Sequence, residues 1–161
     1  MTPARAGVSI PGMTRQRRNW VLLWIIILGL ANFVCYTVMY WYVQGDAKNG
    51  FVEDGHYFVR GHFIHGTQGV AREVRPATWI YSFVHSISIW PTVGAVLVAM
   101  FILARPHIIA TMKADSPWSG STFVTVCITI IVLLTGVSTL YFVLTFVDAL
   151  LTTGRGENWG L

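Results

Sequence analysis

The fold is decided by an apolar stretch that runs from Trp20 to Val43, with the sequence WVLLWIIILGLANFVCYTVMYWYV. The hydrocarbon core of a bilayer is about 30 Å thick, and an α-helix that rises about 1.5 Å per residue crosses it in roughly 20 residues. Two further apolar runs, residues 77–104 and 121–151, also exceed that length. The sequence therefore predicts an all-α integral membrane protein with three transmembrane helices.

The composition agrees with this class. Hydrophobic residues make up 54% of the 161 residues and charged residues 11%, whereas an average soluble domain has about 25% charged residues. The stretches between the runs are too short for a separate soluble domain. We expect a single membrane domain with a basic arm at 1–19, spans at 20–43, 77–104 and 121–151, an external loop at 44–76, an inner loop at 105–120 and a tail at 152–161.

Positive charge lies mainly ahead of the first span. The net charge is +4, and four arginines precede the first apolar run: Arg5, Arg15, Arg17 and Arg18. Basic residues next to a span favour the cytoplasmic side of a membrane. We therefore expect a cytoplasmic N-terminus and an outer loop 44–76, in a bacterial inner (plasma) membrane. This cluster is a topology signal, and we expect no nucleic-acid partner.

Polar residues within the spans form the first candidate site. His85 is an ionisable residue deep inside an apolar run, where such residues are commonly functional. Counting about 1.5 Å per residue puts His85 and Asn32 at the same depth, in the outer third of the bilayer. Other polar residues are expected near this level: Ser82, Ser86, Ser88, Thr135 and Thr139.

Three roles are open for His85. It can be a structural residue bonded to Asn32 or a threonine, it can contact a quinone, or it can ligate a metal such as a haem iron. One histidine cannot supply two axial ligands, so a haem would be shared with a partner subunit. His85 and Asn32 are therefore the candidate cofactor-binding residues, with quinone or haem as the candidate cofactors.

The loop 44–76 carries a second group of candidate ligands. His56, His62 and His65 offer imidazole nitrogens of the kind that bind zinc, copper or iron. His62 and His65 would share a face if residues 57–68 were helical, although the glycines favour a bent, partly ordered loop. The alternatives are a hydrated loop that lies on lipid and a contact surface for an extramembrane partner.

Small and polar residues indicate which sides of the spans pack against protein. In the first span these are Gly29, Asn32 and Tyr36, and in the second they include Gly94 and Ala99. The third span carries the clearest stripe: Thr125, Thr129, Val132, Gly136, Thr139 and Val143. We expect this stripe to face protein.

No catalytic signature identifies a reaction. The scarcity of charged residues, the packing sides and the apolar loop favour a small helical subunit of a multisubunit membrane complex. Quinone-linked electron transfer is the favoured role, with the chain a non-catalytic part of a membrane oxidoreductase. Two alternatives stay open: a subunit of a metal-dependent membrane oxygenase, and an oligomeric transporter or channel subunit in which Asn32, His85 and Asp148 line a polar path.

Overall fold

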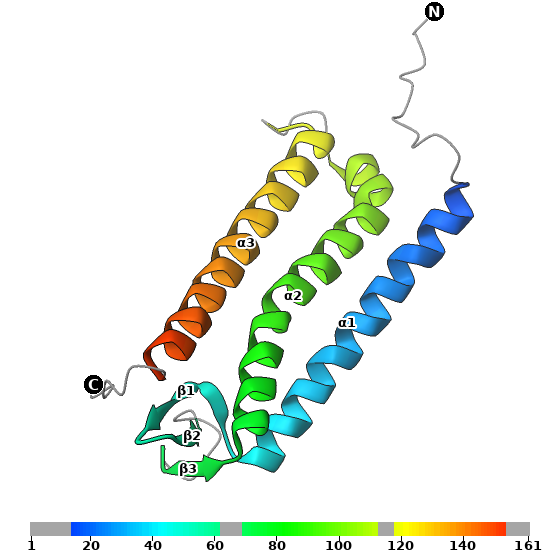
Figure 1. Ribbon diagram of the computed structural model, residues 1–161. Coiled ribbons are helices and arrows are strands. Elements are labelled where there is room, and N and C mark those ends of the chain that lie inside the picture. Colours follow the sequence, from blue (N-terminus) through cyan, green and yellow to red (C-terminus); the bar gives the residue numbers. More distant parts are fainter. Residues whose placement is uncertain (1–13, 62–68, 113–117, 154–161) are drawn as a thin grey trace, which may run out of the picture.

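Three long helices dominate the computed structural model, which describes residues 14–61, 69–112 and 118–153. They are α1 (Arg15–Val43), α2 (Pro76–Thr111) and α3 (Gly120–Thr153). All three are long and apolar enough to cross a membrane, as predicted. Helix α2 lies between the other two and contacts both (Figure 1).

A small antiparallel sheet lies at one end of the helices, where the sequence predicted a bent loop (Figure 1). Strands β1 (Asp46–Glu53), β2 (His56–Arg60) and β3 (Ala71–Val74) pair in the order β1-β2-β3. Asp54 and Gly55 join the first two strands with φ angles of 49° and 79°, as a tight hairpin turn requires. The all-α class is therefore wrong for this part of the chain.

A hydrophobic core joins the sheet to the helices. Val59 of β2 is fully buried, and Trp79 in the first turns of α2 is 1% exposed. The Trp79 ring meets Tyr57 of β2 edge-on, with centroids 5.6 Å apart, and stacks on Phe146 of α3 at 6.4 Å. Aromatic rings favour such edge and offset contacts. The core thus fixes the sheet against α2 and α3.

The helix ends follow from local sequence. The side chain of Thr14 accepts a hydrogen bond from the backbone N–H of Arg17 at 3.3 Å and caps the start of α1. Helix α2 begins at Pro76, a residue suited to a first helical turn. It continues through Pro106 to Thr111, so the expected end near residue 105 is wrong. Pro106 has no N–H to donate to the carbonyl oxygen of Ile102, but the helix continues past it.

Glycines allow α2 to approach its two neighbours closely. A Cβ on Gly94 would lie 2.6 Å from Thr135 Oγ1 of α3, and a Cβ on Gly29 of α1 would clash with Val96 of α2. Membrane helices use small residues for such close approach. The packing sides predicted around Gly29 and Gly94 are therefore confirmed.

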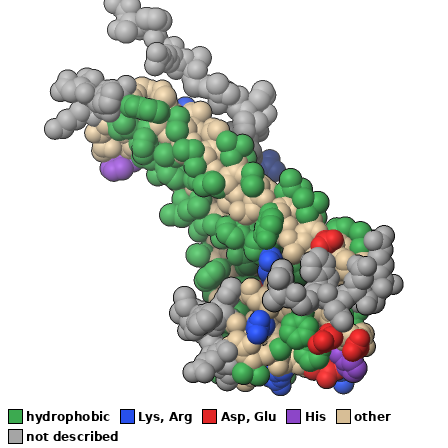
Figure 2. All heavy atoms as spheres, turned by 90° about the vertical axis from the view of Figure 1, so that its left-hand side faces the viewer, with side chains coloured by type: hydrophobic (Ala, Val, Ile, Leu, Met, Phe, Trp, Pro, Cys, Tyr) green, Lys and Arg blue, Asp and Glu red, His purple; other side chains and the backbone are tan. Residues whose placement is uncertain are grey.

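The predicted stripe of α3 does not pack within the described part of the chain. A Cβ on Gly136 would meet nothing within 4 Å there, and Thr125, Thr129, Val132 and Val143 are exposed. Figure 2 shows hydrophobic side chains over the helices, while charged side chains gather mainly at the sheet end. The outer face of α3 therefore offers an apolar surface containing small residues.

Candidate functional site

His85 lies at the contact between α1 and α2, opposite Asn32. His85 Nε2 and Asn32 Oδ1 are 3.2 Å apart. The amide nitrogen of Asn32 lies 3.4 Å from Ser88 Oγ and 3.1 Å from Thr92 Oγ1. This contact confirms that Asn32 and His85 lie at the same level along the helices.

The hydrogen bonds around Asn32 determine the tautomer of His85. The Ser88 hydroxyl donates to the His85 carbonyl oxygen at 2.7 Å, and the Thr92 hydroxyl donates to the Ser88 carbonyl oxygen at 2.6 Å. Because each hydroxyl has one proton, both hydroxyls accept from the Asn32 amide group. The carbonyl oxygen of Asn32 then faces the imidazole, so His85 Nε2 carries a proton and donates it.

The other ring nitrogen of His85 is left as a buried acceptor. When Nε2 of a neutral imidazole is protonated, Nδ1 has a lone pair and no proton. Nδ1 of His85 is buried and has no hydrogen-bond partner among the described residues. The rings of Tyr36 and Tyr81 stand edge-on to the imidazole, at centroid distances of 5.5 and 5.4 Å. Since buried polar atoms are nearly always paired, Nδ1 is where a donor or a metal would bind.

A buried carboxylate lies close to this histidine. Asp46 is 4% exposed. Its Oδ2 accepts a hydrogen bond from the Tyr36 hydroxyl at 2.8 Å, and its Oδ1 accepts one from the Asn49 backbone N–H at 3.2 Å. The Ser86 hydroxyl lies 3.4 Å from Oδ2 but donates to the Ser82 carbonyl oxygen at the shorter distance of 2.9 Å. Each carboxylate oxygen therefore has a donor, as a buried charged group requires.

The turn after α1 explains how Asp46 reaches the helices. Gln44 adopts the left-handed conformation with a φ of 63°, and Gly45 follows it with a φ of 155°. The backbone N–H of Ala47 then donates to Ser82 Oγ of α2 at 3.1 Å. This bond fixes the start of β1 on α2 and holds Asp46 at the α1–α2 contact.

Asp46 also lies between two hollows. A small one of about 10 Å³ is lined by Tyr36, Asp46, Ser82 and His85, among others, and has about the volume that one water needs. An open groove of about 330 Å³ is lined by Asp46 together with residues of α3. The ammonium of Lys48 lies there, 5.3 Å from the ring centre of Phe142. Asp46 therefore connects the surroundings of His85 with an open surface.

The predicted layer of polar residues is only partly formed. Thr135 and Thr139 hydroxyls donate to Ile131 and Thr135 carbonyl oxygens of their own helix, each at 2.7 Å. Thr135 lies beside Gly94, which is about 13 Å beyond His85 along α2 at the helical rise per residue. The expectation that Thr135 shares the level of His85 is therefore wrong.

The predicted metal ligands are not brought together in the described residues. His56 lies exposed on β2, with its Nδ1 atom 2.6 Å from Glu73 Oε1 on β3. That hydrogen bond, and then the negative charge of Glu73, raise the pKa of His56 above its usual value. His62 and His65 lie outside the described residues. The helical arrangement that would place His62 and His65 on one face does not begin at Tyr57, because residues 57–60 belong to β2.

No group of three or more His, Cys, Asp or Glu side chains suited to a metal ion occurs in the described part of the chain. No protein-family model, curated protein or solved structure matches this chain. The candidate site is therefore described from the positions of its own residues. We call Asn32, Tyr36, Asp46 and His85 together the His85 site. The sequence alone gave no role to Asp46.

Proposed function

We propose that this chain is a helical subunit of a multisubunit membrane complex that oxidises a quinol, and that the His85 site receives the quinol protons. The observation that carries the proposal is the buried Nδ1 of His85, which has a lone pair and no described partner while Asn32 engages Nε2. A quinol hydroxyl is a donor and suits this acceptor through one water, for which the small hollow beside His85 has room. An oxidised quinone presents carbonyl oxygens, which are acceptors and do not suit it.

His85 acts as a proton acceptor in this proposal. Oxidation of a quinol releases two electrons and two protons. The electrons pass to a redox centre of a partner subunit, and the protons leave in turn through Nδ1 of His85 as a general base. Imidazole is the side chain that most often acts as a general base in proteins.

Asp46 provides the next step for those protons. It lines the small hollow with His85 and also the open groove with Lys48. The Tyr36 hydroxyl and the Asn49 backbone N–H donate to its carboxylate and hold it in place. Carboxylates of this kind commonly form proton relays in membrane proteins. The proton therefore leaves on the side of the sheet.

The uncovered helix faces support membership of a complex. Small residues on a membrane helix allow a second helix to approach closely, and Gly136 has free space around its Cα within the described chain. Trp20 and Trp24 of α1 are also largely exposed. We propose other membrane subunits on the α3 stripe, lipid on the remaining apolar faces and an extramembrane partner over the sheet.

The arginines ahead of the first apolar run give the proposed orientation. Basic residues next to a span favour the cytoplasmic side, so we propose a bacterial inner membrane with the N-terminus in the cytoplasm. Charged side chains gather mainly at the opposite end, around the sheet (Figure 2). In this orientation the His85 site and its groove lie towards the outer side, where released protons would leave.

A haem iron shared with a partner subunit is a second candidate occupant of the site. The same unpaired lone pair on His85 Nδ1 supports it, because a neutral imidazole is a common iron ligand. The two candidates differ in their optical signature. A haem absorbs in the visible region, whereas a quinol does not.

The proposal is tested by isolating the chain under gentle conditions. The tagged chain is extracted from its native membranes in a mild detergent, and the eluate is assayed for other polypeptides, optical bands, metals and quinol oxidation. We expect stable partner polypeptides, among them one with a redox centre, and quinol-dependent electron transfer. A stable monomer without partners would contradict the proposal. A haem band that disappears in His85→Ala while the complex stays assembled would select the second candidate.

A further inference from the structure

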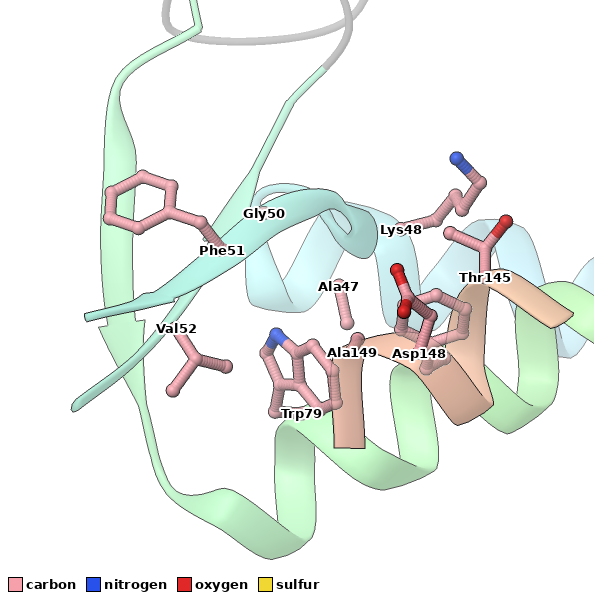
Figure 3. Close-up of a pocket in the computed structure, with 10 residues that line it drawn as sticks. Ala47, Lys48, Gly50, Phe51, Val52, Trp79, Thr145, Asp148 and Ala149 are labelled. Atoms are coloured by element: carbon pink, nitrogen blue, oxygen red, sulfur yellow. The ribbon is translucent and has the colours of Figure 1, made fainter. Parts of the chain in front are cut away.

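An apolar cavity of about 170 Å³ lies between β1, the first turns of α2 and the last turns of α3 (Figure 3). Its lining includes residues of α3, whereas the small hollow beside His85 is lined by residues of α1. The two spaces are therefore separate. The walls of the cavity are mostly apolar and aromatic: Ala47, Phe51, Val52, Trp79, Phe83 and Ala149. Lys48, Thr145 and Asp148 supply its polar part.

The indole N–H of Trp79 is an unused donor at this cavity. Trp79 is 1% exposed, and its Nε1 atom is buried with no hydrogen-bond partner among the described residues. Figure 3 shows the indole nitrogen on the side of the ring that faces β1. An indole N–H can only donate, and buried donors nearly always have an acceptor. An acceptor oxygen placed beside Nε1 would satisfy this donor.

The size and chemistry of the cavity restrict what supplies that oxygen. An engineered apolar cavity of about 150 Å³ holds benzene, so this cavity has room for one ring or a short acyl segment. A single water needs two to four polar partners, whereas Ala47 and Val52 beside the ring are apolar. Binding cavities of this type combine apolar walls with a few directed polar groups. A neutral apolar molecule with a carbonyl group meets both conditions.

We propose that this cavity binds a neutral carbonyl group carried on an apolar body, and that its oxygen accepts the Trp79 Nε1 hydrogen. Membranes offer two sources of this chemistry: the ring of an oxidised quinone and the ester end of a lipid acyl chain. The inference goes beyond the proposed function, because His85 is an acceptor for a quinol and Trp79 is a donor for a carbonyl. It does not depend on electron transfer.

The test measures binding to the purified full-length chain in detergent by calorimetric titration. One probe is a decyl-substituted benzoquinone, and the other is a short-chain diacyl phosphatidylcholine. Trp79→Phe keeps an aromatic ring and removes the N–H, and Trp24→Phe makes the same change at a side chain that is 55% exposed on α1. Ala149→Phe fills the cavity. Unfolding temperatures of all variants show that the fold is retained.

We expect at least one probe to bind with saturation, and Trp79→Phe to weaken it about tenfold, as loss of one hydrogen bond does. Trp24→Phe should bind like the wild type, and Ala149→Phe should not bind. The carbonyl comes from a quinone if Trp79→Phe weakens the binding of the benzoquinone alone. It comes from a lipid ester if Trp79→Phe weakens the binding of the phospholipid alone. Weaker binding of both probes to Trp79→Phe supports recognition of the carbonyl group that they share.

Equal binding by Trp79→Phe and Trp24→Phe for both probes, or no binding of either probe, would overturn the inference. A second measurement needs no variant. A photoreactive azidobenzoquinone and a photoreactive acyl phospholipid are cross-linked to the wild-type chain, and we expect at least one of them to label peptides containing residues 47–52 and 145–149. Labels confined to other peptides count against the cavity. These tests read binding alone, so a negative result leaves the proposal for His85 intact.

Discussion

His85 Nε2 and Asn32 Oδ1 lie 3.2 Å apart across the contact between α1 and α2. Ser88 and Thr92 fix the orientation of the Asn32 amide, so that its oxygen faces the imidazole and accepts the hydrogen of His85 Nε2. This hydrogen bond divides the imidazole into a structural nitrogen and a free one. The two nitrogens can therefore be tested separately, one by stability and the other by turnover.

The structural nitrogen should be replaceable by an amide. His85→Leu leaves the Asn32 oxygen unpaired, and we expect the unfolding free energy to fall by about 0.5–2 kcal/mol. His85→Gln places an N–H near the position of Nε2 and should cost clearly less. Unfolding of both variants in detergent, followed by circular dichroism, measures the difference. Equal losses would show that the bond to Asn32 contributes nothing to stability.

The hydroxyl of Tyr36 should stabilise the protein through Asp46. It donates to the buried carboxylate at 2.8 Å, and hydrogen bonds to charged groups contribute about 1.5–3 kcal/mol. We expect Tyr36→Phe to destabilise the wild type by an amount in this range. In an Asp46→Asn background the same change should cost less, because the charge is gone. Additive effects in this double-mutant cycle would contradict the coupling.

Gly94 should tolerate no side chain. A Cβ would lie 2.6 Å from Thr135 Oγ1, and overpacking of this kind costs roughly 1–3 kcal/mol. Gly94→Ala should therefore lower the unfolding temperature of the isolated chain. Gly136→Ala is the matched control on the open side of α3 and should leave that temperature unchanged. A neutral Gly94→Ala would mean that α2 and α3 lie farther apart.

Gly136 should instead matter for assembly. A larger residue there meets open space within the described chain, but it would keep a partner helix at a distance. We expect Gly136→Leu to leave the chain folded and to reduce the amount of partner polypeptides that co-purify with it. Quantitative mass spectrometry of the detergent eluate measures this. Full recovery of the partner polypeptides would show that the α3 stripe is not the interface.

The pairing of His56 with Glu73 should appear as a pH effect. The hydrogen bond and charge of Glu73 raise the pKa of His56 above its unfolded value of 6.5. The stability from this pair is therefore fully present below pH 6.5 and is lost as the pH rises through the folded pKa. Both side chains are exposed, so the effect on overall stability is small.

An NMR titration of the His56 ring protons checks this prediction. The midpoint should lie above 6.5 in the wild type and should fall in Glu73→Gln, which removes the charge of the partner. An unchanged His56 midpoint would show that the pair does not form in solution.

Length and apolar composition were sufficient to predict the three helices, because crossing a bilayer sets a minimum run of apolar residues. The sheet was missed although a signal was present. Asp54 and Gly55 form the dipeptide typical of a two-residue hairpin turn, and the neighbouring residues FVE and HYFVR are rich in strand-forming types. The glycines of the loop instead favour a bent segment, and that signal conflicts with the hairpin.

Only part of the candidate site could be predicted from the sequence. Counting residues along two helices brought Asn32 and His85 together correctly, because a helix has a constant rise. The same count failed for Thr135, since the relative shift of two helices depends on close contacts such as that at Gly94. Asp46 could not be predicted, because its position depends on the turn at Gln44 and Gly45.

The most direct test of the central claim separates the two nitrogens of His85 in the assembled complex. His85→Gln keeps a donor towards Asn32 and removes the acceptor Nδ1, and His85→Asn is the matched amide with its oxygen near the position of Nδ1. The measurement is quinol oxidation per assembled complex. We predict that His85→Gln assembles like the wild type and loses about 100-fold in turnover, as expected for removal of a general base, with His85→Asn retaining more activity. Wild-type turnover in a fully assembled His85→Gln complex would contradict the account and make His85 a structural residue.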